Sequence, residues 1–441
     1  MKQAIVKKGK INQLDVPINN LKYGYIKIKV IYSAISPGTE FITVNDSSNS
    51  VFKKIKNNPN SIKKVTQVIK NKGILNTINT VKNKLSDYLA LGYSISGIVD
   101  EVNSNSNEFK KGDFVAAAGG GYATHGEYVA VPKNLVAKLK SSKHIETCST
   151  VALGAIAMQG VRRCNLNLGE FGVIFGTGIL GLIALQLMKL SGIRVIAIDI
   201  DNNRLDLAKS LGADYVINSN NHNLIEKIHL ISNNQGADAV LFAASTSKST
   251  PLSQAFKCCR KKGKVVLLGV SGMNIDRNDI YEKEIDLLVS TSYGPGRYDN
   301  FYEEEGNDYP YSYVRWTEKR NMEDYIRLIE NIDLKINELN PSILQFKNIT
   351  SEYEKFKESK SLLGIIKYDS KTNTSKDSKA IIKTNIDIKS HINVGVIGAG
   401  SFSQSIILPN LKNLSKTFNL HTISSTQGLN ARKTSEIFNS K

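Results

Sequence analysis

The chain has 441 residues, of which 41% are hydrophobic, and a formal net charge of +18 at pH 7. This length allows about two to three domains with a sizeable core. The lysines are spread over the whole chain among Asn, Ile and Ser, and no motif interleaves them with aromatic residues. We therefore expect compositional drift toward lysine and predict no nucleic-acid partner.

Cysteine spacing and hydropathy predict a cytoplasmic protein without a membrane partner. The cysteines are Cys148, Cys164, Cys258 and Cys259, with no C-x-x-C pair and no metal-site spacing. Such residues are typical of reduced thiols. The most apolar stretch, 171–200, is interrupted by glycines and basic residues, and no charged-then-apolar leader opens the chain. We expect a buried strand–helix–strand in this stretch rather than a membrane span.

Residues 1–147 have the pattern of a β-rich domain. Strand-like apolar runs occur at Ile26–Ile35, Ile95–Val102 and Glu127–Val131. A polar, lysine-dotted insertion at 52–89 interrupts them, and its apolar residues have helical spacing. The predicted domain is therefore a sheet with one long insertion.

From 148 to 291, short apolar strands alternate with helical stretches. The expected strands are Val173–Phe175, Val195–Ile198, Tyr215–Ile217, Ala239–Phe242 and Val265–Leu268. This alternation predicts an α/β fold with a doubly wound parallel sheet of the Rossmann type. The stretch 292–368 is mixed and aromatic, and 369–390 has the composition of a linker.

A glycine fingerprint of the dinucleotide-binding type follows the first of these strands. It reads Gly176-Thr177-Gly178-Ile179-Leu180-Gly181. Glycines there allow a tight turn and a close approach of the backbone to a pyrophosphate, which the N-terminus of the following helix attracts. We predict that these six residues bind the cofactor.

The next strand ends at Asp199, which can accept hydrogen bonds from ribose hydroxyls and repel a 2′-phosphate. This favours NAD as the cofactor. Arg204, near Asp201, keeps NADP open, because an arginine can accommodate the phosphate. The alternative for Asp199 is that it caps the helix expected at Asn202–Leu211.

A second fingerprint, Gly398-Ala399-Gly400-Ser401-Phe402-Ser403, follows the apolar run Val394–Ile397. Gly398, Gly400 and Ser403 are its expected turn residues. The next strand ends in serines rather than an acid, and a dinucleotide-binding half needs about three strands. We expect 391–441 to be an incomplete second Rossmann segment without activity of its own, explained by a truncated gene or a sequence fragment. A homodimer that completes the sheet is the alternative.

The residues quoted above resemble a known family. Gly169–Ala213 is similar to the nucleotide-binding domain of medium-chain alcohol dehydrogenases. VIYSAISPGTE (30–40), LGYSISGIVDEV (91–102) and KKGDFVAAAGGGYATHGEYVAVP (110–132) resemble the family's catalytic domain. The resemblance implies a GroES-like catalytic domain from 1–147 with 292–368, and an NAD-binding domain at 148–291.

Two further stretches resemble a bi-domain subgroup of that family. Ser292–Met322 and VGVIGAGSFSQSIILPNL (394–411) look like an enzyme fused to an oxidoreductase of the Gfo/Idh/MocA type. The resemblance implies that 391–441 is the truncated NAD-binding start of that partner.

The chain departs from its zinc-dependent relatives at every catalytic ligand. They hold zinc through a first-loop cysteine, the histidine of a Gly-His-Glu motif and a further cysteine or glutamate. The corresponding places hold Ser36 or Pro37, Tyr93, and a residue near Ala152. Zinc needs at least three N, S or carboxylate ligands in tetrahedral geometry. We predict no metal site and no zinc.

Without zinc, other groups must polarise the substrate oxygen and move the proton. The resemblance places Thr39 at a proton-relay position, with Glu40 beside it, and Tyr93 at a former ligand position. His125 lies with Tyr122 on the glycine-rich loop 119–126, which resembles a cleft-lining segment. We predict catalytic roles for the first four and substrate contact for Tyr122. The alternative is that the tyrosines pack in the core and His125 is structural.

The block 293–320 combines tyrosines with arginines, and from it we predict Tyr293 and Arg297 as substrate residues. Arginine binds anions bidentately and tyrosine stacks on sugar rings, so an anionic or sugar-like small molecule is expected. The alternative is a charged surface turn. The resulting hypothesis is a zinc-independent NAD(P)(H) oxidoreductase for an alcohol or carbonyl, in a setting such as surface-polysaccharide metabolism. A non-catalytic NAD-binding module for redox sensing or docking is the competing hypothesis.

Overall fold

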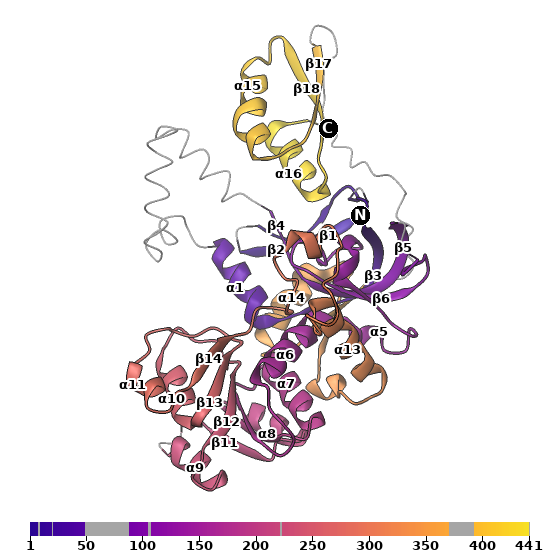
Figure 1. Cartoon of the computed structure of the whole chain (residues 1–441). Helices are drawn as coiled ribbons and strands as arrows, with labels where there is room; N and C mark the ends of the chain where they lie inside the picture. Colours follow the sequence, from indigo (N-terminus) through magenta and orange to yellow (C-terminus); the bar gives the residue numbers. More distant parts are fainter. Residues whose placement is uncertain are drawn as a thin grey trace.

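The computed structural model describes residues 1–7, 9–19, 21–48, 88–104, 107–220, 223–369 and 392–440. The insertion expected at 52–89 and the linker expected at 369–390 lie almost entirely outside these residues. Two large sheets with flanking helices form the body, so the predicted α/β class is confirmed (Figure 1). None of the described helices has the length and apolar character needed to cross a membrane.

The first large sheet belongs to the β-rich part and has the order β15-β16-β3-β5-β6-β8, with β7 paired to β3. Its strands are β3 (Tyr25–Ile35), β5 (Ser94–Asn103), β6 (Phe114–Ala118), β7 (Tyr128–Pro132), β8 (Val136–Lys138), β15 (Ser342–Gln345) and β16 (Gly364–Lys367). A small sheet, β2-β1-β4, covers one end, with β1 (Lys2–Lys7), β2 (Lys10–Asp15) and β4 (Leu89–Ala90). Because β16 pairs antiparallel with β3, residues distant in sequence complete the sheet of the N-terminal part.

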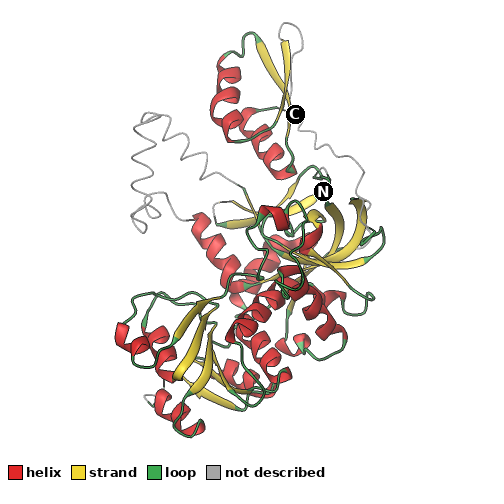
Figure 2. Ribbon diagram, viewed as in Figure 1, coloured by secondary structure: helices red, strands yellow, loops and turns green. Residues whose placement is uncertain are grey.

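The second sheet is parallel throughout and has the order β11-β10-β9-β12-β13-β14. The strands are β9 (Phe171–Phe175), β10 (Arg194–Asp199), β11 (Tyr215–Asn218), β12 (Ala237–Phe242), β13 (Cys259–Leu267) and β14 (Asp286–Val289). Its flanking helices are α7 (Ile179–Leu190), α8 (Asn202–Ser210), α9 (Leu224–Ile231), α10 (Thr250–Cys258) and α11 (Arg277–Tyr281) (Figure 2). The strand order reverses between β9 and β12, and ligands of such sheets bind at this point.

Helix α6 (Val151–Cys164) joins the two sheets into one body. It packs on α7 and on α13 (Glu318–Glu330), and its small residues allow close contact. One continuous core extends from Ala34 and Ala116 in the first sheet, through α6, to Ile174 in the second. The remaining helices near this junction are α1 (Pro37–Ser48), α5 (Ile145–Cys148), α12 (Asn300–Glu303) and α14 (Ile349–Glu358).

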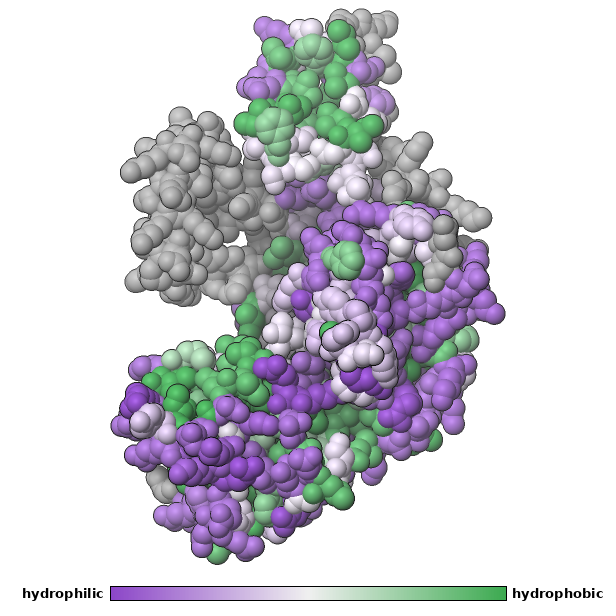
Figure 3. Space-filling model, viewed as in Figure 1, coloured by the Kyte–Doolittle hydropathy of each residue, from purple (hydrophilic) through white to green (hydrophobic). Residues whose placement is uncertain are grey.

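The C-terminal segment is small and has little core. Strands β17 (Ile392–Ile397) and β18 (Phe418–Ser424) form a parallel pair, covered by α15 (Leu408–Asn413) and α16 (Gly428–Phe438). Only Ala399, Leu408 and Ile423 form its buried cluster, whereas Ile397 is 93% exposed. Apolar residues therefore gather on the visible surface of this segment, at the top of Figure 3.

Candidate functional site

The first fingerprint forms the loop between β9 and α7, and its glycines are sterically required. Gly176 has φ +101°, and a Cβ there would lie 2.6 Å from the backbone nitrogen of Ala244, just after β12. A Cβ on Gly181 would collide with the Gly176 carbonyl oxygen. At Gly178 a Cβ would meet nothing within 4 Å, so this side of the loop is open. The open side lies at the start of α7, where unpaired N–H groups attract phosphate.

Asp199, the last residue of β10, is anchored to this loop. Its Oδ2 atom accepts hydrogen bonds from the Thr177 backbone nitrogen at 2.7 Å and from Thr177 Oγ1 at 3.0 Å. The cap of α8 is Asp201, which accepts from the Asn203 nitrogen at 2.9 Å. Asp199 Oδ1 accepts from the Asp201 nitrogen at 3.0 Å, so the Asp199 carboxylate lies beside the loop and does not cap the helix.

Arg204, the residue that kept NADP open, is 3.8 Å from the Asp201 carboxylate. This pairing partly offsets its charge. The fingerprint loop, with Thr177, Ile179 and Leu180 at the beginning of α7, and the anchored Asp199 together fit a dinucleotide.

The residues that the resemblance aligns with zinc ligands lie close together, and their side chains are not of the kind that binds zinc. Tyr93 lies next to Ser36 and Thr39. Ser94 Oγ donates to the Ser149 carbonyl at 2.5 Å and accepts from the Ala152 nitrogen at 3.0 Å. These side chains offer hydroxyls and a methyl group, not the N, S or carboxylate ligands that zinc selects. Across the described parts of the chain, no group of three or more His, Cys, Asp or Glu residues could hold a metal ion.

Tyr93 is a hydrogen-bond donor in this environment. Burial raises the pKa of Tyr93 to about 12, Ser36 lowers it, and the Glu40 charge raises it further. Burial also raises the pKa of Tyr293, and nearby Tyr93 raises it further. Both phenols therefore stay protonated at neutral pH. The structure thus places the predicted residues Thr39, Glu40 and Tyr293 around Tyr93.

A chain of buried hydrogen bonds begins at Glu40. Glu40 Oε2 lies 3.1 Å from His125 Nε2, and His125 Nδ1 lies 2.8 Å from Ser33 Oγ. Ser33 Oγ in turn lies 3.0 Å from the Tyr368 hydroxyl. All four side chains are buried. Glu40 and His125 were predicted as site residues, whereas Ser33 and Tyr368 were not, because nothing local in the sequence pairs two residues so far apart.

The backbone fixes His125 in this chain of contacts. Its nitrogen donates to the Leu91 carbonyl at 2.7 Å, and its carbonyl accepts from the Ala4 nitrogen at 2.8 Å. Gly92 has φ +89°, and a Cβ there would lie 2.6 Å from His125 Nδ1. A glycine at 92 therefore leaves the space that the imidazole ring occupies.

Tyr122 and Arg297, two predicted substrate residues, have partners within the protein. The Tyr122 hydroxyl donates to Glu304 Oε1 at 2.8 Å, and its ring packs edge-on against Tyr25. The Arg297 Nη1 atom is 2.6 Å from Glu303 Oε1, and the guanidinium lies over the Tyr298 ring. Their substrate roles stay predictions. Binding an anion through Arg297 would compete with Glu303.

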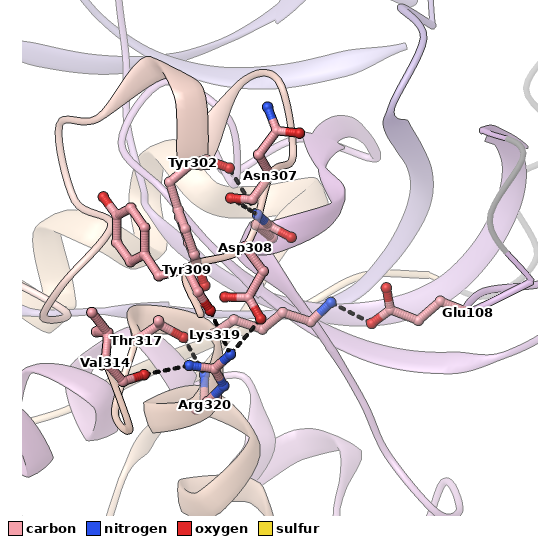
Figure 4. Close-up of polar contacts among 10 residues, drawn as sticks. Glu108, Tyr302, Asn307, Asp308, Tyr309, Val314, Thr317, Lys319 and Arg320 are labelled. Carbon is pink, nitrogen blue, oxygen red and sulfur yellow. Dashed lines mark hydrogen bonds and ion pairs between the residues drawn. The ribbon is translucent and has the colours of Figure 1, made fainter. Parts of the chain in front are cut away.

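Two other cations of the block 293–320, Lys319 and Arg320, also have acidic partners. Lys319 pairs with Glu108, and Arg320 pairs with Asp308 and donates to the Val314 carbonyl at 2.6 Å (Figure 4). Asn134 Nδ2 donates to the Tyr302 carbonyl at 2.8 Å, which attaches the block to the β-rich part. The charged residues that suggested a surface turn thus stabilise a compact lobe.

The second fingerprint has a turn but no acidic strand end. Gly398 has φ +96°, and a Cβ on it or on Gly400 would meet nothing within 4 Å. Ser403 is buried and begins a short π-helical segment rather than a regular helix. Strand β18 ends at Ser424. The ribose acceptor of the first fingerprint has no counterpart there.

Comparison with known proteins agrees with this geometry. Residues 180–305 match the zinc-binding dehydrogenase family. An NAD-dependent alcohol dehydrogenase of Sulfurisphaera tokodaii is 29% identical over 216 residues, which are 42% of this chain and 62% of that protein. D-guloside 3-dehydrogenase of Escherichia coli K12 is 26% identical over 275 residues, which are 60% of this chain and 73% of that protein. The chain thus spans less than two thirds of the first of these relatives.

Among solved structures, alcohol dehydrogenase TADH from Thermus sp. ATN1 superimposes with a TM-score of 0.63 at 16% identity. The superposition covers 84% of this chain and 100% of that one. The GroES-like and Rossmann architecture expected from the sequence is therefore confirmed as the fold.

Proposed function

We propose that this chain is a zinc-independent, NAD-dependent oxidoreductase of the zinc-type medium-chain alcohol dehydrogenase family. It oxidises an alcohol, or reduces the corresponding carbonyl, on a sugar-like small molecule. The observation that carries the proposal is the Glu40–His125 pair buried beside Tyr93, the residue expected at a zinc-ligand position of the family.

The backbone of the loop 176–181 and Asp199 would hold NAD, which when bound would supply the hydride acceptor. Asp199 favours NAD over NADP because its carboxylate occupies the region of the ribose hydroxyls. This preference agrees with the NAD-dependent relative.

The hydroxyl of Tyr93 positions and polarises the substrate oxygen. Its raised pKa keeps the proton on the phenol, so it donates a hydrogen bond rather than acting as a base. Alcohol oxidation also releases the O–H proton of the substrate, which the protein must take up. Thr39 and Glu40 are the groups beside Tyr93 that receive this proton, and His125 accepts it from Glu40.

A polyhydroxylated substrate suits the block around Tyr293. Aromatic faces lie next to paired charges, as in Arg297 and Glu303, which together offer donors and acceptors to sugar hydroxyls. The name of the D-guloside 3-dehydrogenase relative supports a glycosidic substrate. A cytoplasmic location, a homodimer, the fused Gfo/Idh/MocA-type origin of the C-terminal segment and the surface-polysaccharide setting remain predictions.

The test combines NADH titration with a screen of polyols and glycosides as substrates. We expect NADH binding and turnover of at least one sugar alcohol or glycoside, with Tyr93→Phe lowering turnover about 10²-fold or more while NADH affinity is kept. Tyr23→Phe, at an exposed tyrosine, is the matched control. NADH binding without turnover across the screen would favour a redox-sensing or docking module instead.

A further inference from the structure

The Glu40–His125 pair has no direct access to solvent. His125 is 1% exposed and Glu40 is 2% exposed. A reaction that places a proton on this pair in each turnover needs a route for that proton to reach water. Among the described residues, the His125 ring has two hydrogen-bond partners, Glu40 and Ser33. A proton that leaves the pair through this ring therefore passes to Ser33.

The contacts of Ser33 lead to a cavity. The Tyr368 hydroxyl contacts Ser33 at 3.0 Å, and Tyr368 also lines a cavity of about 110 Å³. Lys2, Lys347 and Asp369, which are exposed, line the same cavity, so it communicates with solvent. This volume is enough for several water molecules.

We propose that Ser33 and Tyr368 form the path by which the buried Glu40–His125 pair exchanges the proton of the reaction with water in this cavity. The role of this path rests on the proposed function, whereas the contacts that form it are independent of that function. It adds two positioning residues that lie on β3 and just beyond β16, strands that pair with each other.

The proton transfers balance along the path. In the tautomer with the ring proton on Nδ1, His125 Nε2 takes the proton of Glu40 and Nδ1 gives its own to Ser33. Ser33 passes its hydroxyl proton to Tyr368, and Tyr368 passes its own to water in the cavity. One proton enters at Glu40 and one leaves at Tyr368, and the reverse sequence serves carbonyl reduction.

Tyr368 acts in this path as a neutral hydroxyl. Burial raises its pKa, and the charges of Glu40 and Glu127 raise it further, whereas Ser33 lowers it. The Tyr368 hydroxyl therefore stays protonated at neutral pH, and the proton is relayed through it. Stacking on Phe346, with ring centroids 4.3 Å apart, holds the ring in place.

The charged groups around the cavity complete the electrostatic setting of the exit. Lys2, Lys29, Lys347, Glu127 and Asp369 line it. The Glu127 carboxylate accepts from the Lys2 backbone nitrogen at 2.7 Å, so it is held at the mouth of the path. The cavity thus has both acidic and basic groups in its lining, which suits transfer of a proton to ordered water.

The experiment compares Ser33→Ala and Tyr368→Phe with Tyr325→Phe. Tyr325 is a matched control, because it is also a fully buried tyrosine but its hydroxyl contacts Thr150, at 2.8 Å, and no residue of the path. In protein labelled with ¹⁵N-histidine, NMR measures how fast the His125 ring N–H exchanges with solvent. We expect both path variants to slow this exchange by at least about tenfold and the control to leave it unchanged.

The exchange rate of the His125 ring N–H tests the proton path separately from the dehydrogenase function. If the two path variants exchange as fast as the parent, the path is overturned, whatever the activity. If exchange slows but no substrate is turned over by the parent, the path holds and the dehydrogenase function fails. With an active parent, the path variants should also lose turnover that small imidazole buffers restore, while NADH affinity stays the same; loss without rescue would contradict the path.

Discussion

Glu318 is a carboxyl group that is fully buried and has no hydrogen-bond partner for either oxygen. Burial raises the pKa of Glu318 to about 9; nearby Glu303 adds to this and Arg297 opposes it. Three tyrosines interact electrostatically with Glu318, namely Tyr293, Tyr302 and Tyr309. The group is therefore protonated in the folded protein at neutral pH and ionised in the unfolded chain.

This difference predicts how stability depends on pH. A carboxyl whose pKa is raised on folding contributes fully below its unfolded pKa of 4.5, and this contribution is lost as the pH rises toward about 9. Glu318→Gln removes the ionisable group, so it should raise the free energy of unfolding by about 3 kcal/mol at pH 7 and flatten its pH dependence. Urea unfolding at pH 5 and pH 8 measures this; a substitution that destabilises equally at both values would contradict it.

Asp199 determines cofactor preference and also holds the fingerprint loop through Thr177. Asp199→Ser removes both the ribose acceptor and the repulsion of a 2′-phosphate, so NADH binding should weaken about tenfold or more and the gap to NADPH should narrow. The control is Asp206→Ser, at an exposed aspartate of α8. Fluorescence titration with both cofactors checks this, and an unchanged preference in the Asp199 variant would remove that residue from the site.

At the scale of elements, the strands buried on both faces could be predicted from the sequence. β9, β10 and β12 are continuous apolar runs, so their positions followed directly. β14 was missed, because it has four residues and lies at the edge of the sheet with Val289 exposed. Glycine spacing likewise predicted the cofactor loop.

The contact between β3 and β16 could not be predicted in the same way. It joins residues more than 300 positions apart, for which the sequence contains no local signal. Ser33 and Tyr368 therefore stayed out of the predicted site, although Glu40 and His125 were in it. The partners of Arg297 and Tyr122 could not be predicted from the sequence either, because such polar contacts depend on how the loops pack.

Helix α6 joins the two sheets, and its glycines differ in what they tolerate. A Cβ on Gly154 would overlap the Tyr325 ring of α13, whereas a Cβ on Gly160 would meet only flexible leucine side chains. Gly154→Ala should lower stability by about 1–3 kcal/mol. Gly160→Ala should be neutral or gain up to about 1 kcal/mol from helix propensity. Thermal unfolding of the two variants tests this; equal midpoints would mean that the α6–α13 contact is not tight.

At the scale of the whole molecule, the C-terminal segment is peripheral to the dehydrogenase body. Its recorded contacts with the body include the Gly428 nitrogen with Asn19 Oδ1 at 2.8 Å and Tyr88 with Glu436 at 2.5 Å. Both are at the small sheet, not at the fingerprint loop. Ile392, Ile397 and Phe402 leave apolar surface exposed.

Removing 369–441 should therefore keep NADH affinity and raise the soluble yield. Both sheets and the fingerprint loop remain in such a variant, and the exposed apolar surface is lost. NADH titration and size-exclusion chromatography of the two forms check this. Misfolding or loss of NADH binding would show that the segment belongs to the working core.

The central claim is hydride transfer without zinc, and one sample tests it most directly. Metal content and turnover are measured on the same preparation before and after treatment with a chelator, using deuterium-labelled substrate to follow transfer to NAD. We predict no stoichiometric zinc and the same rate of deuterium transfer in both cases. About one zinc per chain, with transfer lost on chelation and restored by zinc, would contradict the account.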